Sequence, residues 1–235
     1  MPVADFTADA RVLWRLLRGQ PKEGSHAERL QAFYAPQAER YDAFRARLLH
    51  GREELIEELA IAPGERIVEL GCGTGSSLER LGRRTPEFAS LDLVDLCPAL
   101  LEQTRQRAAG QANVRVIEAD ATRWQPGIPV DVVFLSYALT MIPDWASAIA
   151  NAHAMLRPGG RIGIVDFHLP TDGNPLGMRF WRSWFGHDGV HLSDKHLPAL
   201  RQLFTERQSS ERWAAVPYLP GLRAPYYIFV GERTD

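Results

Sequence analysis

The sequence predicts a doubly wound α/β fold, in which helices cover both faces of a mostly parallel sheet. Strand-like and helix-like segments alternate from Arg66 to Asp166. Most of the expected strand cores are runs of Val, Ile, Leu and Phe without polar alternation, as in parallel sheets that are covered on both faces. A glycine-rich turn from Gly71 to Gly75 joins the first of these strands to a helix. We therefore expect one α/β domain preceded by helices.

The expected elements follow one another without an internal repeat. The strands are Arg66–Leu70, Ser90–Asp95, Asn113–Glu118, Val130–Leu135 and Arg161–Asp166, and the helices include Pro98–Ala109 and Asp144–Leu156. A helix is then expected at Ser193–Phe204, before strands at Glu211–Val216 and Tyr226–Gly231. The link between these last two strands is too short for a crossover helix, so it predicts an antiparallel hairpin.

The region before the sheet predicts a helical extension. Helical patterns cover Asp9–Arg18, Ala27–Leu49 with a break at Pro36, and Arg52–Leu59. We therefore divide the chain into an N-terminal extension or lid, residues 1–60, and a ligand-binding domain, residues 61–235.

Composition limits the classes of function. The net charge of −2 over 235 residues gives no reason to expect a nucleic-acid partner. No apolar run reaches the ~18 residues that a spanning helix needs. The first residues lack the pattern of a signal peptide, and Cys72 and Cys97 are the only cysteines. These features predict a reduced, cytoplasmic setting. They predict no particular oligomeric state.

The glycine-rich turn has the pattern E-x-G-x-G-x-G, formed by Glu69, Gly71, Gly73 and Gly75. Glycine at alternate positions lets the backbone turn tightly and approach a ligand. The dinucleotide fingerprint needs a third glycine where this chain has Ser76. A carboxylate at the end of the next strand, such as Asp95, can accept hydrogen bonds from ribose hydroxyls in several classes of nucleoside-binding protein.

Further landmarks lie in the same order as in one enzyme family. Asp120 and Ala121 follow the third strand, and the segment Leu156 to Gly160 precedes the fifth. With E-x-G-x-G-x-G and the C-terminal hairpin, this order resembles the class I methyltransferases. The resemblance implies a five-stranded parallel sheet plus an antiparallel hairpin, and S-adenosyl-L-methionine as cofactor with S-adenosyl-L-homocysteine as product. The cofactor-binding residues that it implies are Tyr34, Tyr41, Glu69, Gly71, Gly73, Gly75, Asp95, Leu96, Asp120, Ala121 and Ser136.

Segments outside the cofactor motifs bear on the methyl acceptor. Residues 16–19, 26–42, 136–145, 180–185 and 217–227 are similar to the N-methyltransferases of betaine-lipid synthesis, which trimethylate diacylglyceryl-homoserine. The resemblance implies an amine-bearing lipid as substrate. Methylation of a soluble amine or of a quinone-type carbon or oxygen is an alternative, as is cofactor binding without catalysis.

An amine acceptor predicts aromatic side chains around the site, because aromatic faces stabilise a methylated cation by ~0.5–2 kcal/mol. We expect Tyr137 to hold the acceptor and His168 to accept its proton or bind it, since they follow the fourth and fifth strands. Further candidate substrate contacts are Trp181, Trp184, Phe185, His187, Tyr218 and Tyr226. The histidines and aspartates between His187 and His196 match no familiar metal spacing, so no metal is expected.

A diacylglycerol lipid must be reached at a bilayer. Asp9–Arg18 and Met178–Phe185 both pair apolar side chains with arginines, a pattern found in helices that lie on membranes. Three arginines in the first segment can contact anionic head groups. The sequence therefore predicts reversible peripheral association with an anionic surface. We expect this association at the cytoplasmic face of the membrane.

Overall fold

A computed structural model describes most of the α/β region. It covers Glu28, Gln31, Ala32, residues 48–169, Arg179, Trp181, residues 190–217 and residues 221–234. The helix expected at Asp9–Arg18 and the division of the chain at residue 60 stay predictions, since most of the extension lies outside these residues.

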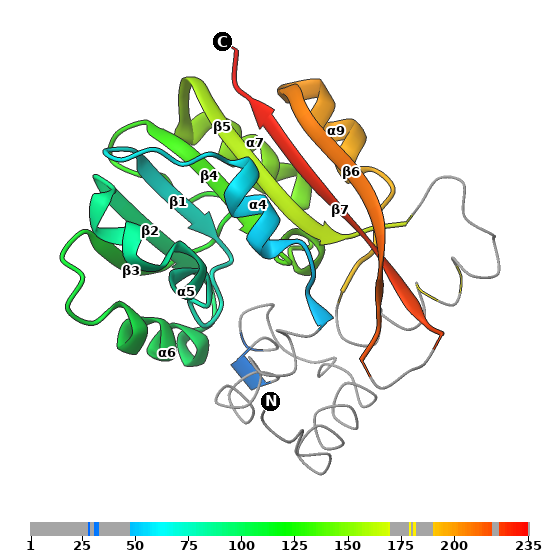
Figure 1. The fold of residues 1–235 in the computed structure, drawn as a ribbon, viewed down its shortest axis with the longest axis horizontal. Helices are drawn as coiled ribbons and strands as arrows, with labels where there is room; N and C mark the ends of the chain where they lie inside the picture. The colour runs from blue at the N-terminus through cyan, green and yellow to red at the C-terminus, as the bar shows by residue number, and fades with distance from the viewer. Residues whose placement is uncertain are drawn as a thin grey trace.

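The described residues form a seven-stranded sheet with the order β3-β2-β1-β4-β5-β7-β6 (Figure 1). Five strands are parallel: β1 (Arg66–Leu70), β2 (Ser90–Asp95), β3 (Val114–Glu118), β4 (Val130–Ser136) and β5 (Leu156–Phe167). The antiparallel strand β7 (Arg223–Glu232) lies between β5 and the edge strand β6 (Thr205–Ala215). This arrangement confirms the predicted fold class.

Helices lie on both faces of the sheet. One apolar cluster joins a sheet face to α4 (Arg52–Glu58), α5 (Ser77–Leu81) and α6 (Pro98–Ala108). The other joins the opposite face to α7 (Trp145–Met155) and α9 (His196–Leu203). In Figure 1, α4 crosses in front of the sheet while α7 and α9 lie behind it. Short 3₁₀ helices, η1 (Gly82–Glu87) and η2 (Leu139–Met141), complete the connections.

The last strands differ from the expected boundaries. Strand β6 begins at Thr205, six residues before the predicted Glu211, and α9 ends at Leu203. Most side chains of β6 are exposed or half-buried, because β7 is its only strand neighbour in the described sheet. The polar run Thr205–Ser210 can therefore form an edge strand, although it lacks the apolar pattern of a buried strand.

Parallel pairing places the carboxyl ends of β1, β2, β3 and β4 along one edge of the sheet. Helix α7 starts beside this edge, where Asp144 accepts a hydrogen bond from the backbone N–H of Ser147 at 3.2 Å. This is an N-cap, and it ends the loop that follows β4. The edge is where open α/β sheets bind ligands.

Candidate active site

A cavity of about 350 Å³ opens at the carboxyl ends of the strands. Its volume lies in the usual range for a small-molecule site. The predicted cofactor residues that line it are Glu69, Gly71, Gly73, Asp95, Leu96, Asp120, Ala121 and Ser136, and the predicted acceptor residue Tyr137 also lines it. The fold thus gathers residues from four strand ends around one cavity.

The three glycines of the turn after β1 have positive φ angles but different surroundings. A Cβ at Gly71 would lie 2.3 Å from the Cβ of Ala138, and one at Gly75 would lie 2.8 Å from Thr104 Cγ2. A Cβ at Gly73, whose φ is +56°, would meet no described atom within 4 Å. Gly71 and Gly75 therefore allow close packing of the turn, whereas Gly73 borders open space in the cavity.

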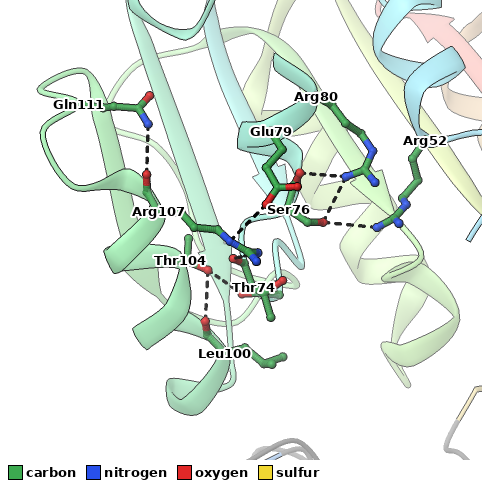
Figure 2. A network of polar contacts seen from close by, with 10 residues as sticks. Arg52, Thr74, Ser76, Glu79, Arg80, Leu100, Thr104, Arg107 and Gln111 are labelled. Atoms are coloured by element: carbon green, nitrogen blue, oxygen red, sulfur yellow. Dashed lines mark hydrogen bonds and ion pairs between the residues drawn. The ribbon is translucent and has the colours of Figure 1, made fainter. Parts of the chain in front are cut away.

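Helix α6 holds the turn in place (Figure 2). The Thr104 hydroxyl donates to the carbonyl of Gly73 at 2.7 Å, and Arg107 Nη1 donates to the carbonyl of Thr74 at 2.8 Å. Arg107 also lies 3.7 Å from a carboxylate oxygen of Glu79 on α5. These contacts fix the backbone that faces the cavity before any ligand is bound.

Asp95, the last residue of β2, joins two loops at the cavity wall. Its Oδ2 accepts a hydrogen bond from the N–H of Gly73 at 2.8 Å, and its Oδ1 accepts one from the N–H of Cys97 at 2.9 Å. A carboxylate has about four lone-pair sites, so it can accept further hydrogen bonds from ligand hydroxyls.

Glu69, near the end of β1, is a buried carboxyl group at the cavity. The hydroxyl of Ser77 donates to its Oε2. Burial raises the pKa of Glu69 to about 8, and the Ser77 hydroxyl and the Arg80 guanidinium oppose this rise only in part. At neutral pH the empty site therefore holds mostly the protonated form, and a cationic ligand group would favour its ionisation.

Asp120 stabilises the turn after β3. Its Oδ1 accepts hydrogen bonds from the backbone N–H and the hydroxyl of Thr122 at 2.9 and 2.7 Å, and its Oδ2 lies 3.1 Å from Arg123. Burial alone would raise the pKa of Asp120, but the Thr122 hydrogen bonds and the Arg123 charge lower it. The contact of Asp120 with an adenine group stays a prediction.

Tyr137 follows β4 in a left-handed backbone conformation, with φ +54°. Such a conformation is uncommon for a bulky residue and is concentrated at functional sites. The Tyr137 hydroxyl donates to the carbonyl of His50 at 2.8 Å, and its ring lies 4.7 Å from the ring of Phe167. Tyr137 therefore connects the cavity wall to the segment that precedes α4.

The structure brings some of the predicted substrate residues together. Trp181 and Tyr226 are buried in the same apolar cluster as Tyr137. The remaining expected contacts lie outside the described residues; they are Tyr34, Tyr41, Trp184, Phe185, His187 and Tyr218. Among the described residues, Gly75, Trp181, Tyr226 and His168 do not line the cavity.

His168 lies with the opposite apolar cluster. Its Nε2 is 3.4 Å from a carboxylate oxygen of Glu211, and its ring is 5.8 Å from that of Tyr227, which belongs to the cluster under α7 and α9. Burial lowers the pKa of His168 to about 4. These contacts favour a structural role, and proton transfer by His168 stays a prediction.

Arg52 and Asp166 are among the contributors to the site that were not predicted. Arg52, the first residue of α4, lines the cavity; an arginine at a helix start gives no sequence signal for this. The buried carboxylate of Asp166 accepts from the Thr140 hydroxyl at 2.7 Å and from the backbone N–H groups of Thr140 and Phe167. It thereby fixes η2, whose last residue, Met141, lines the cavity together with Ile142. The position of Asp166 near the end of a predicted strand was the sequence signal that could have identified it.

The cavity fits the predicted cofactor in three respects. Gly73 leaves room beside the turn, and Asp95 offers carboxylate oxygens in the middle of the row of strand ends. At the β1 end, the Glu69 carboxyl and the Arg52 guanidinium both line the cavity, where we expect the amino acid portion of S-adenosylmethionine. Within the described residues, no group of three or more His, Cys, Asp or Glu side chains has an arrangement suited to a metal ion.

Comparisons with known proteins agree with this site. A family described as "Methyltransferase domain" matches residues 67–160. The chain is 30% identical over 166 residues to the demethylmenaquinone methyltransferase of Deinococcus radiodurans. This match covers 67% of this chain and 67% of the relative. It is 35% identical over 111 residues to a trans-aconitate 2-methyltransferase of Methylobacterium nodulans, and this match covers 47% of this chain and 42% of the relative.

The fold is also similar to solved structures. The N-methyltransferase NodS of Bradyrhizobium japonicum, in complex with S-adenosyl-L-homocysteine, has a TM-score of 0.61 and 18% sequence identity to this chain. The likeness covers 78% of this chain and 86% of NodS.

Proposed function

Because the chain belongs to the class I S-adenosylmethionine-dependent methyltransferases, we propose that it methylates the amino group of a diacylglyceryl-homoserine lipid. The predicted fold, cofactor and enzyme class are confirmed by the family and by its solved structures. The lipid amine is our proposal. The observation that supports it is that Tyr137, Phe167, Trp181 and Tyr226 are buried in one apolar cluster, in which the rings of Tyr137 and Phe167 pack edge to face.

The residues at the cavity have separate tasks in this proposal. The bound cofactor supplies an electrophilic methyl group on a sulfonium centre. Gly73 leaves space for it, and Asp95 accepts hydrogen bonds from its ribose hydroxyls. Ser136 ends β4 and Tyr137 follows it; both line the cavity, and Tyr137 also belongs to the apolar cluster. Because methyl transfer needs no covalent intermediate, positioning of the two reactants provides most of the catalysis.

The aromatic cluster suits an acceptor that gains positive charge. Tyr137 and Phe167 pack edge to face, and Trp181 and Tyr226 extend the same cluster. Each aromatic face can stabilise a cation by ~0.5–2 kcal/mol. The proton of an ammonium acceptor must leave before transfer. His168, the predicted acceptor of this proton, does not line the cavity, and its contacts with Glu211 and Tyr227 favour a structural role.

A second candidate function is methylation of a quinone-type ring carbon. The Deinococcus radiodurans relative, with 30% identity over two thirds of both chains, favours it. A diacylglycerol lipid and a quinone with a long apolar tail would both be reached at a membrane. Peripheral membrane association is therefore part of both proposals. No helix among the described residues has the length and apolar character to cross a bilayer.

The acceptor can be identified with purified protein and isotopically labelled S-adenosylmethionine. Detergent-dispersed diacylglyceryl-homoserine, a demethylated menaquinone and a soluble amine would be offered separately and in competition, with product masses as the readout. We expect the lipid amine to gain up to three methyl groups. Methylation of the quinone alone would replace our proposal with the second candidate, and methylation of the soluble amine alone would exclude both lipid acceptors.

A further inference from the structure

The hairpin of β6 and β7 extends past the rest of the sheet on the side where the cavity opens. Tyr226 of β7 pairs with Phe167, the last residue of β5, and the residues of β7 before Tyr226 have only β6 as a strand neighbour in the described sheet. Because β5 is parallel to β4, this end of the hairpin lies at the carboxyl edge of the sheet, where the cavity is. Figure 1 shows β6 and β7 continuing beyond the tip of β5.

The two faces of this hairpin end differ in burial. One face packs on the apolar cluster under α4, α5 and α6, through Ala214, Val216, Leu222 and Ala224. The residues that alternate with these are exposed, and they are Trp213, Ala215 and Arg223. Since successive side chains of a strand point to opposite faces, these three share the outer face of the hairpin end. The strand register places Arg223 directly opposite Ala215, next to Trp213.

Trp213 is one of three exposed large apolar residues in the described part of the chain. Ile128 is 54% exposed, Trp213 46% and Leu203 40%. Ile128 lies just before β4, at the amino edge of the sheet. Strand β6 runs in the direction of β5, since both are antiparallel to β7, so Leu203 before its start also lies at the amino edge. Of the three residues, only Trp213 is therefore at the edge that contains the cavity.

A cation lies beside this tryptophan. The Arg223 guanidinium donates from Nη2 to the carbonyl of Trp213 at 2.8 Å, across the two strands. Glu211 shares the outer face of β6, but its carboxylate lies 3.4 Å from His168 Nε2, beside the end of β5. Tryptophan is enriched where bilayers meet water, and arginine is attracted to anionic head groups. The exposed pair of Trp213 and Arg223 thus has the chemistry of a membrane contact.

We propose that the outer face of the hairpin end, formed by Trp213, Ala215 and Arg223, docks on an anionic lipid bilayer and turns the cavity edge toward it. The inference rests on the lipid-soluble acceptor of the proposed function, and it holds for the lipid amine and for the quinone. An acceptor with an apolar tail stays in the bilayer, so the edge with the cavity has to face the membrane. One tryptophan and one arginine give weak, reversible docking.

Co-sedimentation with vesicles that contain no methyl acceptor tests the docking face by itself. The full-length wild type, Trp213→Thr, Arg223→Glu and the matched control Ile128→Thr are mixed with phosphatidylcholine vesicles that contain phosphatidylglycerol. Threonine suits an edge strand, so Trp213→Thr should fold. We expect Trp213→Thr to bind roughly tenfold more weakly than the wild type, as for about 1.4 kcal/mol, and Ile128→Thr to bind like the wild type.

Salt separates the two contributions. Arg223→Glu should also bind roughly tenfold more weakly at low salt, because an attraction to anionic lipid becomes a repulsion. High salt should remove this difference from the wild type, whereas the defect of Trp213→Thr should persist, because apolar contacts are not screened. If thermal unfolding shows that Trp213→Thr is not folded, Trp213→Gln takes its place.

Three results would overturn the inference. They are the absence of vesicle binding by the wild type, wild-type affinity of Trp213→Thr, and equal weakening in Ile128→Thr. Methylation of detergent-dispersed acceptors tests the proposed function separately and should be the same in all four proteins, since none of the three positions lines the cavity. A wild type that methylates a dispersed lipid without binding vesicles would refute the docking face alone. Methylation of a soluble amine alone, with vesicle binding that depends on Trp213, would refute the proposed acceptor alone.

Discussion

The glycines of the turn after β1 illustrate how residues of one type serve different purposes. Gly71 allows the turn to approach Ala138, and Gly75 allows it to approach Thr104 on α6. Gly73 has no described neighbour for a side chain and borders the cavity. Packing thus explains two of the glycines, and the third borders the cavity, where we predict that the cofactor binds.

Replacement of Gly73 should therefore affect binding more than folding. We expect Gly73→Val to place a side chain in the cavity and to weaken S-adenosylhomocysteine binding at least about tenfold, equivalent to 1.4 kcal/mol. Gly64→Val is a matched control for backbone strain, because Gly64 has φ +80° and equally open surroundings but does not line the cavity. Calorimetry and thermal unfolding separate the effects. Equal loss of affinity in both variants would contradict the role of Gly73.

Glu69 should release a proton when the cofactor binds. Burial raises its pKa to about 8 in the empty site, so it is mostly protonated at pH 7. A ligand ammonium beside it would lower this pKa and displace the proton, so affinity should increase from pH 6 toward pH 8 and then level off. Calorimetry of S-adenosylhomocysteine at pH 7 in buffers of different ionisation enthalpy measures the release. Glu69→Gln should abolish it, and identical release in that variant would assign the proton elsewhere.

At the scale of elements, the face of the sheet under α7 and α9 contains polar rings. The His196 ring lies 4.8 Å from Trp145 and 6.3 Å from Tyr227, and the His168 ring lies 5.8 Å from Tyr227. Neither nitrogen of His196 has a hydrogen-bond partner among the described residues. Burial, supported by the nearby His168 and opposed by Asp194, lowers the pKa of His196 to about 4.

This environment predicts sensitivity to acid. The ordinary pKa of 6.5 exceeds the folded-state value of about 4, so the unfolded chain binds more protons as the pH falls below 6.5. The contribution of neutral His196 to stability is thus present above pH 6.5 and is reduced by roughly 2 kcal/mol at pH 5. His196→Phe should retain the ring contacts and lose less stability between pH 7 and pH 5 than the wild type does.

The same experiment includes a control for surface histidines. His191 is exposed, so His191→Asn should follow the wild-type dependence on pH. Urea unfolding at each pH provides the free energies, and comparison with the wild type removes the opposing contributions of Asp166 and Glu69, whose pKa values are raised by burial. A His196→Phe variant that loses as much stability as the wild type would refute this account.

The strand order and the cofactor loop could be predicted because their signals are local. Apolar runs mark β1, β2 and β4, and the glycine turn follows β1 directly. The start of β6 could not be predicted from the sequence, because an edge strand tolerates the polar run that begins at Thr205. His168 directly follows β5 and lies on the face opposite Phe167, and its sequence position alone does not show this. Arg52 reaches the cavity through packing of α4, which is a tertiary effect.

At the scale of the whole molecule, the proposed lipid acceptor requires contact with a bilayer. The segment Asp9–Arg18, which lies outside the described residues, has an apolar stripe bordered by Arg11, Arg15 and Arg18. Each arginine near an anionic surface contributes ~1 kcal/mol, an attraction that salt screens. Replacement of the three arginines with glutamate should reduce co-sedimentation with anionic vesicles, and high salt should have the same effect on the wild type.

Activity on a detergent-dispersed substrate separates docking from catalysis in this triple variant. It should change little, because the cofactor cavity is formed by other parts of the chain. If the triple variant binds vesicles as well as the wild type does, or if it fails to fold, these arginines do not serve membrane docking.

We infer that the cavity at the strand ends binds S-adenosylmethionine through Asp95. Calorimetry of S-adenosylhomocysteine with the wild type and Asp95→Ala tests this role of Asp95. We predict saturable binding to the wild type and a loss of roughly 1.5–3 kcal/mol in the variant, since a charged acceptor is removed from the ribose hydroxyls. Unchanged affinity in a folded Asp95→Ala variant, or tight binding of NADH in place of S-adenosylhomocysteine by the wild type, would contradict it.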